Sequence, residues 1–261
     1  MKKLRRTNQY MLQLEIPDPD FVRPPRDGQR NWILNRFLKE AAEDLEKLHE
    51  LAAHFVPGGE PSDISEREHR LLDDEEIMED WQVKVMKAMA NLMPVGGDVL
   101  EIGFGRGIAS DLLQSREPRS HTIVECHSGI FEKLKAWREA RSDRDIRLLQ
   151  GKWQDLTQQF ETYDGVFFHT YPLSPEEFSE YVSRSATFAE HFFASAAAIL
   201  KPGGQFTYLT NEIDSLSRGH QRALLKHFGA FTVRSLNDLQ VPDETSDAQW
   251  AQETVLVVAE R

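Results

Sequence analysis

A glycine-rich turn follows a short apolar run and is the first place where the sequence could hold a ligand. Residues 98–107 read DVLEIGFGRG, so that glycines alternate with larger residues at the end of the run. Glycine permits positive φ angles and lets the backbone approach a ligand closely. At the carboxyl end of a strand in an open α/β sheet, such a turn receives a nucleotide-like cofactor. We therefore predict that the cofactor contacts Gly103, Phe104, Gly105, Arg106, Gly107, Ile108 and Ala109.

The charge beside this turn favours S-adenosyl-L-methionine over a dinucleotide. Glu101 stands just before the first glycine, where a carboxylate attracts the amino group and the sulfonium of adenosylmethionine and repels a pyrophosphate. A dinucleotide motif would also need glycine or alanine at position 108, which is isoleucine here. We therefore add Glu101 to the cofactor site. Two alternatives stay open, an NAD(P)-dependent oxidoreductase and a turn whose glycines have only a structural role.

The ends of the next two apolar runs carry side chains suited to an adenosine. Glu125 follows the turn by about twenty residues, where an acid typically accepts the ribose hydroxyls. Cys126 comes directly after it, and Trp153 and Gln154 follow the next run. The indole could flank adenine, and the amide could hydrogen-bond to it. We assign these residues to the cofactor site, although Glu125 could be a surface acid and Trp153 a core residue.

Short β-rich runs alternate with helical segments after residue 97, which is typical of βαβ units and a parallel sheet. The last two runs are joined by a loop without a helix, which predicts a final antiparallel hairpin. We therefore expect an α/β fold with a Rossmann-like, seven-stranded, mostly parallel sheet. The expected strands are residues 98–102, 121–125, 146–150, 163–169, 205–210, 231–236 and 250–259. The expected helices are residues 108–115, 128–141, 174–200 and 215–228.

The N-terminal part of the chain has a different pattern. Apolar residues recur at spacings of three and four between residues 30 and 55, which predicts an amphipathic helix. Residues 57–70 are rich in turn formers and charges and indicate a linker or a flap. A second helix should begin at Asp73 or Asp74 and continue through Leu92. We therefore divide the chain into a helical extension at 1–70, used as a lid or a dimer contact, and a cofactor-binding domain at 71–261.

Composition limits the partners and the compartment. The formal net charge of −12 repels the phosphate backbone of nucleic acids. The longest apolar run, residues 192–200, is too short to cross a bilayer, and no secretory signal is recognisable. The single cysteine, Cys126, cannot form an internal disulfide and has no metal-site spacing around it. We expect a cytoplasmic monomer or homodimer that binds a small-molecule substrate, with no metal, nucleic acid or membrane partner.

Several short segments together resemble the guanidinoacetate N-methyltransferase family, a branch of the class I adenosylmethionine-dependent methyltransferases. They are Leu100 to Ala109, Val124-Glu125-Cys126-His127 with Gly129 and Phe131, Gly151-Lys152-Trp153-Gln154-Asp155, Tyr163-Asp164-Gly165, Thr170-Tyr171-Pro172-Leu173-Ser174 and Leu200-Lys201-Pro202-Gly203-Gly204. The likeness runs from about Glu75 to the C-terminus. It implies that residues 104–109, Glu125, Trp153 and Gln154 bind S-adenosyl-L-methionine.

This sequence departs from the family at the positions that the resemblance assigns to the substrate. Carboxylates that face the guanidinium are replaced by Gln82, just after Trp81, and by His169, just before Thr170. A neutral threonine that receives the substrate carboxylate is replaced by Glu212, after Asn211. Each lost charge-assisted hydrogen bond would be worth about 1.5 to 3 kcal/mol. The departures therefore predict that guanidinoacetate is not the substrate.

The remaining side chains suggest an uncharged acceptor. His169 could accept a proton from a nitrogen nucleophile as the catalytic base, or it could be a packing histidine. Gln82 offers both a donor and an acceptor, and Tyr171 and Trp250 could stack on a flat ring. The expected acceptor is a neutral nitrogen heterocycle, and in these respects the chain resembles the toxoflavin-type azapteridine N-methyltransferases of antibiotic biosynthesis. A guanidino or amino-acid-like acceptor and a non-catalytic adenosylmethionine-binding protein are the alternatives. The predicted acceptor site comprises Trp81, Gln82, His169, Tyr171, Asn211, Glu212 and Trp250, and His169 is also assigned to the cofactor site.

Overall fold

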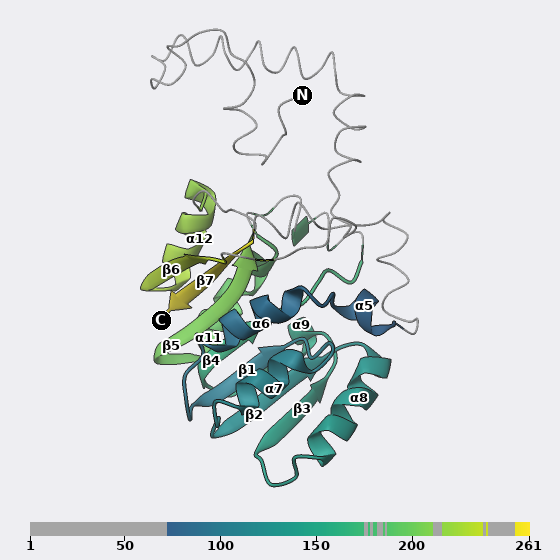
Figure 1. The fold of residues 1–261 in the computed structure, drawn as a ribbon. Coiled ribbons are helices and arrows are strands. Elements are labelled where there is room, and N and C mark those ends of the chain that lie inside the picture. The colour runs from purple at the N-terminus through teal and green to yellow at the C-terminus, as the bar shows by residue number, and fades with distance from the viewer. Residues whose placement is uncertain are drawn as a thin grey trace, which may run out of the picture. The chain divides into compact units, whose positions relative to one another are not determined.

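The computed structural model describes a large part of the expected cofactor-binding domain (Figure 1). The described residues are 72–174, 177, 180, 181, 185, 187–210, 216–236, 239 and 254–261. The helix expected at 30–55 and the linker expected at 57–70 lie outside them. The division of the chain at residue 70 therefore stays a prediction.

A seven-stranded sheet forms the centre of this part of the chain, with the order β3-β2-β1-β4-β5-β7-β6. The neighbouring strands from β3 to β5 run parallel, whereas β7 lies antiparallel to both β5 and β6. This confirms the predicted Rossmann-like fold with a C-terminal antiparallel hairpin. The strands are β1 (Asp98–Ile102), β2 (Ser120–Glu125), β3 (Ile146–Gln150), β4 (Tyr163–Phe168), β5 (Leu200–Thr210), β6 (Ala230–Ser235) and β7 (Val255–Glu260).

Helices cover both faces of the sheet, which explains why its central strands are apolar on both sides. On one face, Val99 packs with residues of α6 and α7, and Ile123 packs against α8. On the other face, Leu100 and Ile102 pack in a core that includes residues of α9, η4, α11 and α12. The helices are α5 (Asp74–Ile77), α6 (Gln82–Ala90), α7 (Ile108–Gln114), α8 (Ser128–Glu139), α9 (Trp153–Leu156), η2 (Thr157–Gln159), η4 (Phe188–Phe192), α11 (Phe193–Ile199) and α12 (Arg218–His227).

The strand order reverses at β1, because the chain proceeds from β1 to β2 and β3 on one side and then returns to β4 on the other. In open α/β sheets, ligands bind outside the carboxyl ends of the strands at such a reversal. The glycine turn follows β1, and His169 follows β4. The fold thus brings the predicted cofactor turn and the predicted base to the same edge of the sheet.

The helix expected from Asp73 or Asp74 to Leu92 is interrupted between α5 and α6. The amide of Gln82 donates to the carbonyl of Glu79 at 3.0 Å, whereas a continuous α-helix would direct it to the carbonyl of Met78. The Met78 carbonyl instead accepts a hydrogen bond from Arg106 Nη1 at 2.7 Å. Periodicity could not reveal this break, because the competing donor is distant in sequence.

The segment expected to form one helix at 174–200 also differs. Its described part contains the 3₁₀ helix η4 followed by α11, and β5 begins at Leu200. The Lys-Pro-Gly-Gly turn is therefore part of β5, whose pairing with β4 is irregular between Tyr163 and Gly165. Among the described residues, no helix is long and apolar enough to cross a membrane.

Candidate functional site

The glycine turn after β1 has the backbone conformation that the sequence predicted. Gly103, Gly105 and Gly107 have positive φ angles of 94°, 55° and 77°. A Cβ atom at Gly103 would lie 2.2 Å from the carbonyl oxygen of His169, and one at Gly107 would lie 2.8 Å from the ring of Phe104. Glycine is therefore required at both positions. The backbone of the turn therefore lies close to the ends of β1 and β4.

The Glu125 carboxylate holds this turn against the end of β2. Its Oε2 accepts hydrogen bonds from the amides of Phe104 at 3.0 Å and Gly105 at 3.4 Å, and its Oε1 accepts one from His127 at 2.8 Å. Only 6% of the Glu125 surface is exposed. A carboxylate has about four lone-pair sites, of which these amides use three, so that Glu125 can still accept one hydroxyl hydrogen. The carboxylate thus supports the turn and remains suited to a ribose.

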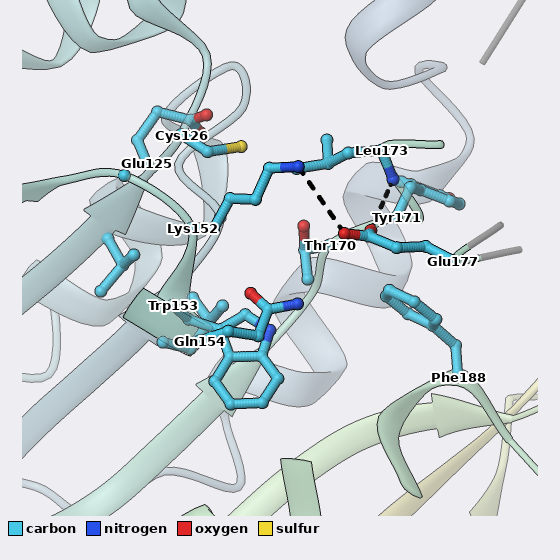
Figure 2. Close-up of a pocket in the computed structure, with 14 residues that line it drawn as sticks. Glu125, Cys126, Lys152, Trp153, Gln154, Thr170, Tyr171, Leu173, Glu177 and Phe188 are labelled. Atoms are coloured by element: carbon cyan, nitrogen blue, oxygen red, sulfur yellow. Dashed lines mark hydrogen bonds and ion pairs between the residues drawn. The ribbon is translucent and has the colours of Figure 1, made fainter. Parts of the chain in front are cut away.

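A small cavity lies beside the turn, between the ends of β1, β2 and β3 (Figure 2). Of the residues predicted from sequence, it brings together Gly103, Glu125, Cys126, Trp153, Gln154 and Tyr171. Its volume is about 30 Å³, which is room for water-sized contents. The carboxylate of Glu125, the indole of Trp153 and the amide of Gln154 suit an adenosine cofactor.

Sequence reasoning did not assign several of the residues that line this cavity. Lys152 and Glu177 face each other across it, with Nζ and Oε1 3.7 Å apart (Figure 2). The other oxygen of Glu177 accepts the amide of Leu173 at 2.9 Å, and the amide of Glu177 donates to Ser174 Oγ at 3.2 Å. The Ser-x-x-Glu spacing is a capping-box signal that could have identified Glu177. The unassigned lining residues are Ile102, Val124, Gly151, Lys152, Thr170, Leu173, Glu177 and Phe188.

Trp153 has a double role in this region. It is 9% exposed and packs in the core, with its ring centroid 4.6 Å from that of Phe192 and 5.2 Å from that of His191. It also lines the cavity together with Gln154. The two alternatives considered for this tryptophan are therefore compatible.

Glu101 differs from its predicted position, because the structure turns its side chain away from the cavity. Successive side chains of a strand point to opposite faces, and the cavity contains Ile102, the neighbour of Glu101. The Glu101 carboxylate is fully buried, and its Oε2 lies 2.6 Å from Ser110 Oγ and 3.0 Å from His121 Nε2. The other ring nitrogen of His121 lies 3.0 Å from Gln114 Nε2. Glu101 therefore belongs to a buried polar cluster under α7 and does not line this cavity, so that its place in the cofactor site stays a prediction.

The side chain of Arg106 also leaves the cavity. Its guanidinium donates to the carbonyl of Met78 at 2.7 Å and to the carboxylate of Asp80 at 2.8 Å. The Arg106 side chain therefore does not line this cavity, and its predicted contact with the cofactor stays a prediction. Ile108 and Ala109 begin α7 behind the turn.

Three of the predicted acceptor residues lie close together on the far side of the turn. Gln82 is 5% exposed, and its Nε2 donates to the hydroxyl of Tyr171 at 3.1 Å. Its Oε1 has no hydrogen-bond partner within the described part of the chain. The rings of Tyr171 and His169 meet edge to face, with centroids 5.8 Å apart. Gln82, Tyr171 and His169 therefore form a neutral polar group beside the end of β4.

His169 is partly exposed as a residue, but protein atoms crowd its imidazole. This desolvation lowers the pKa of His169 to about 4, because burial disfavours the charged form. Its backbone amide donates to the carbonyl of Ile102 at 3.1 Å. At neutral pH the ring is therefore uncharged and can accept one hydrogen bond and donate another.

The remaining acceptor residues fall into two groups. Trp81 is 8% exposed, packs in the core with α6, and donates through its indole nitrogen to the carboxylate of Glu79. Asn211, Glu212 and Trp250 lie outside the described residues. Within the described part of the chain, no cluster of histidine, cysteine and acidic side chains could hold a metal ion.

Comparison with known proteins gives the family and a set of relatives. The sequence model of the guanidinoacetate N-methyltransferase family matches residues 61–239. Protein arginine N-methyltransferase 2 of Aspergillus fumigatus is 32% identical over 132 residues, which cover 47% of this chain and 30% of the relative. The corresponding protein of Gibberella zeae is 22% identical over 245 residues, which cover 82% of this chain and 51% of the relative. This chain therefore spans about half or less of the length of these relatives.

Solved structures share the fold. A protein described as a SAM-dependent methyltransferase of Streptococcus mutans superposes with a TM-score of 0.50 and 17% identity, over 69% of this chain and 48% of that one. TYW2 of M. jannaschii, in complex with AdoMet, superposes with a TM-score of 0.50 and 15% identity, over 72% of this chain and 80% of that one. These likenesses support the predicted methyltransferase fold.

The relatives correct one expectation. We expected the substrate partner to be a small molecule alone, but the relatives are named for methylating arginine in proteins. The predicted cofactor and enzyme class are confirmed at the level of the family, which uses S-adenosylmethionine to methylate nitrogen. This chain belongs to the guanidinoacetate N-methyltransferase family of adenosylmethionine-dependent methyltransferases.

Proposed function

We propose that this chain transfers a methyl group from S-adenosylmethionine to an uncharged nitrogen of its acceptor, such as the nitrogen of a flat heterocycle or an amide. The observation that carries the proposal is the neutral group formed by Gln82, Tyr171 and His169. Gln82 is buried, and its carbonyl oxygen has no hydrogen-bond partner among the residues that the structure describes. This oxygen can accept an N–H hydrogen from the acceptor. An unsatisfied buried acceptor costs about 1–3 kcal/mol, and a bound N–H group would relieve that cost.

The electrostatics of this group favour an uncharged acceptor over a guanidinium. Gln82 and His169 stand where the family resemblance implies carboxylates, and the lowered pKa of His169 keeps its ring neutral. A guanidinium bound here would lose its hydration, and neither Gln82 nor His169 would offer it a carboxylate in exchange. Moving an unpaired cation out of water is far more costly than moving a neutral amide.

The roles of the other residues follow from their positions. Glu125, Trp153, Gln154 and the glycine turn would hold the cofactor, which supplies an electrophilic methyl group when it is bound. Methyl transfer depends mainly on alignment of the acceptor lone pair. Gln82 and Tyr171 would orient the acceptor, and His169 would accept the proton that an acceptor N–H releases.

Arginine in a protein is the second candidate acceptor, and the names of the relatives favour it. Under this alternative, the counter-charge for the guanidinium would come from residues other than Gln82 and His169.

A labelled-methyl transfer assay with S-adenosylmethionine tests the proposal. The acceptor panel contains guanidinoacetate, an arginine-rich peptide, amides and flat nitrogen heterocycles, including an azapteridine of the toxoflavin type. We expect an uncharged nitrogen compound to be methylated fastest, and we expect Gln82→Ala and His169→Ala to slow its methylation at least tenfold. Glu161→Ala, on the surface, serves as the control. Faster methylation of guanidinoacetate or of the arginine peptide would overturn the proposal.

A further inference from the structure

The break between α5 and α6 lies directly over the cofactor turn. A Cβ atom built on Gly105 would lie 3.4 Å from the side chain of Ile77, the last residue of α5. Met78 and Trp81, in the intervening turn, are 7% and 8% exposed. The turn at 78–81 is therefore packed onto the domain next to the glycine turn.

Arg106 supplies the bond that replaces the missing helical one. Its Nη1 donates to the Met78 carbonyl, which in a continuous helix would accept the amide of Gln82. The amide of Gln82 donates to Glu79 instead, and the amide of Val83 donates to Asp80 at 3.2 Å. The hydrogen bond from Arg106 thus fixes the point at which α6 begins, and Gln82 is the first residue of α6.

A continuous path of contacts therefore joins the cofactor turn to the acceptor side. It runs from Arg106 to the turn at 78–81, from there to Gln82, and from Gln82 Nε2 to the hydroxyl of Tyr171. We infer that Arg106 is a positioning residue, which sets the place of Gln82 relative to the cofactor turn. The functional meaning of this inference rests on the proposed acceptor role of Gln82, whereas its structural test does not.

The hydrogen bonds that Arg106 donates to Met78 and to Asp80 should contribute unequally. The side chain of Asp80 is 75% exposed, and that of Arg106 is 19% exposed. Ion pairs with an exposed partner contribute little, because water screens them. The bond to the carbonyl of Met78 involves a buried residue and a charged donor, which makes it the stronger of the two. Removal of Asp80 should therefore have a smaller effect than removal of the Arg106 guanidinium.

Hydrogen–deuterium exchange on the full chain, with S-adenosylhomocysteine as the probe, tests this inference. We expect Arg106→Met to change exchange at the amides of residues 78–83 by at least tenfold. Exchange would be faster if the turn at 78–81 frays. It would be slower at Gln82 if the Gln82 amide instead donates to the Met78 carbonyl, as in a continuous α-helix. We also expect S-adenosylhomocysteine to protect Gln82 in the unaltered chain but not in Arg106→Met.

Matched variants separate positioning from other roles. Arg106→Lys keeps a charged donor and should restore part of the protection, and Asp80→Asn should change exchange less than threefold. Arg147→Met removes a surface arginine paired with Glu161 at 3.0 Å and should leave residues 78–83 unaffected. Because Arg106→Met could fold poorly, Arg106→Lys also provides an intermediate measurement.

Calorimetry with S-adenosylhomocysteine completes the test. The affinity of Arg106→Met should remain within about threefold of that of the unaltered chain, because the guanidinium points away from the cavity. A large loss of affinity would identify Arg106 as a direct cofactor ligand and overturn the inference. Unchanged exchange at residues 78–83 would overturn it as well. Failure of the methyl-transfer proposal alone would alter neither measurement.

Discussion

The carbonyl oxygen of His169 occupies the place where a side chain on residue 103 would lie. A Cβ atom built on Gly103 would be 2.2 Å from that oxygen, and the amide of His169 donates to Ile102, the residue before Gly103. The ends of β1 and β4 are thereby in direct backbone contact at the reversal of strand order. This contact places the predicted base immediately beside the cofactor turn.

Gly103→Ala should therefore destabilise the chain and weaken cofactor binding. Overpacking costs about 1–3 kcal/mol, and a left-handed backbone adds about 1 kcal/mol for a residue with a Cβ atom. Gly203→Ala is the matched control, because Gly203 has a φ of 74° but no atom within 4 Å of the place that a Cβ atom would take. We expect a loss of about 3 kcal/mol in the free energy of unfolding for Gly103→Ala and about 1 kcal/mol for Gly203→Ala. Equal losses in urea unfolding would contradict the steric argument.

Glu125→Gln should weaken the binding of S-adenosylhomocysteine. The substitution keeps the size of the side chain but removes the charge that accepts the amides of Phe104 and His127. Charge-assisted hydrogen bonds contribute about 1.5–3 kcal/mol each, so we expect at least a tenfold increase in Kd by calorimetry. Glu161→Gln is the control, because the Glu161 side chain is 72% exposed. An unchanged Kd for Glu125→Gln would remove this residue from the cofactor site.

The glycine turn and the positions of the strands could be predicted because their causes are local. Positive φ angles require glycine at Gly103 and Gly107, and parallel strands buried on both faces produce apolar runs. The spacing of Glu125 and Trp153 along the chain predicted their shared edge for the same reason. Residues that end successive parallel strands meet at one edge of the sheet.

The partners of Glu101 and Arg106 could not be predicted, because they depend on side-chain direction. Glu101 lies on the face of β1 opposite to that of Ile102, so that it meets Ser110 and His121. Arg106 reaches a carbonyl 28 residues earlier in the chain. The strand period could have assigned the face of Glu101, but nothing local in the sequence identifies His121 as its partner.

The buried pair formed by Glu101 and His121 should contribute strongly to stability without contacting the cofactor. Both side chains have no exposed surface, and Glu101 Oε2 lies 3.0 Å from His121 Nε2. Leaving a buried polar group without its partner costs about 1–3 kcal/mol. We expect Glu101→Ala and His121→Ala each to cost about that much in urea unfolding, and the double variant to cost less than the sum. Additive losses would mean that the two side chains are not coupled.

An exposed ion pair provides the control for this comparison of single and double variants. Lys133 and Asp74 are 3.1 Å apart, with side chains 54% and 65% exposed, and their coupling should be below about 1 kcal/mol. Under conditions in which Glu101→Ala is folded, its Kd for S-adenosylhomocysteine should differ less than threefold from that of the unaltered chain. A larger change would restore Glu101 to the cofactor site.

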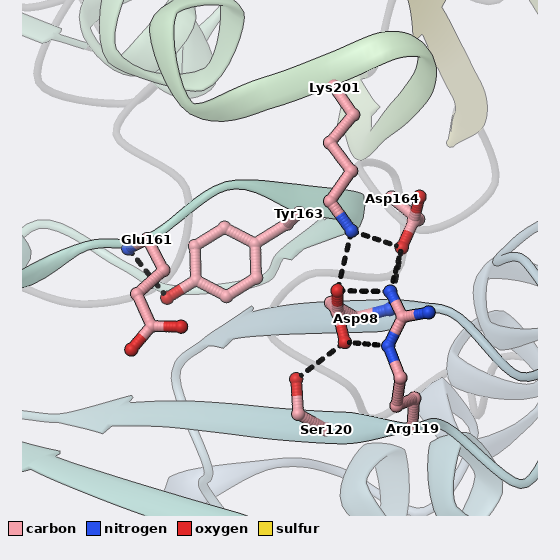
Figure 3. Close-up of polar contacts among 7 residues, drawn as sticks. All are labelled: Asp98, Arg119, Ser120, Glu161, Tyr163, Asp164 and Lys201. Atoms are coloured by element: carbon pink, nitrogen blue, oxygen red, sulfur yellow. Dashed lines mark hydrogen bonds and ion pairs between the residues drawn. The ribbon is translucent and has the colours of Figure 1, made fainter.

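A cluster of charges at the opposite edge of the sheet should protect the fold against acid (Figure 3). The Arg119 guanidinium beside Asp98 holds the pKa of that carboxyl well below its usual range, and Lys201 adds to the effect. Burial opposes the shift at Asp164, but hydrogen bonds from Lys201 and from the amide of Asp98 still lower its pKa. Because these pKa values are lower in the folded state, the cluster stabilises the fold above about pH 4 and loses this effect as the pH falls.

Lys201→Met should therefore move acid unfolding to higher pH. The Lys201 ammonium lies 2.8 Å from Asp164 and also contacts Asp98, so that its removal leaves these carboxyls easier to protonate. The effect at neutral pH should be about 1 kcal/mol or less, because the lysine is partly exposed. Circular dichroism between pH 2 and 7 measures the midpoint. Lys135→Met, which removes a surface pair with Glu132, should leave the midpoint unchanged, and an equal shift in both variants would contradict the prediction.

The neutral imidazole of His169 should make both stability and catalysis depend on pH in a defined direction. Desolvation lowers the pKa of His169 to about 4 in the folded chain, whereas an unfolded histidine titrates near 6.5. Between these values the unfolded state binds more protons, so that stability should decrease as the pH falls from about 6.5 to about 4. The loss should be at most about 3.5 kcal/mol, because one pKa unit corresponds to about 1.4 kcal/mol. If neutral His169 accepts the acceptor's proton, the rate of methyl transfer should also fall with a midpoint near pH 4 and not near pH 6.5.

Titration of the His169 ring by NMR measures its pKa directly, and His169→Gln assigns the resonance. A midpoint near pH 6.5 would contradict both the stability and the rate expectation.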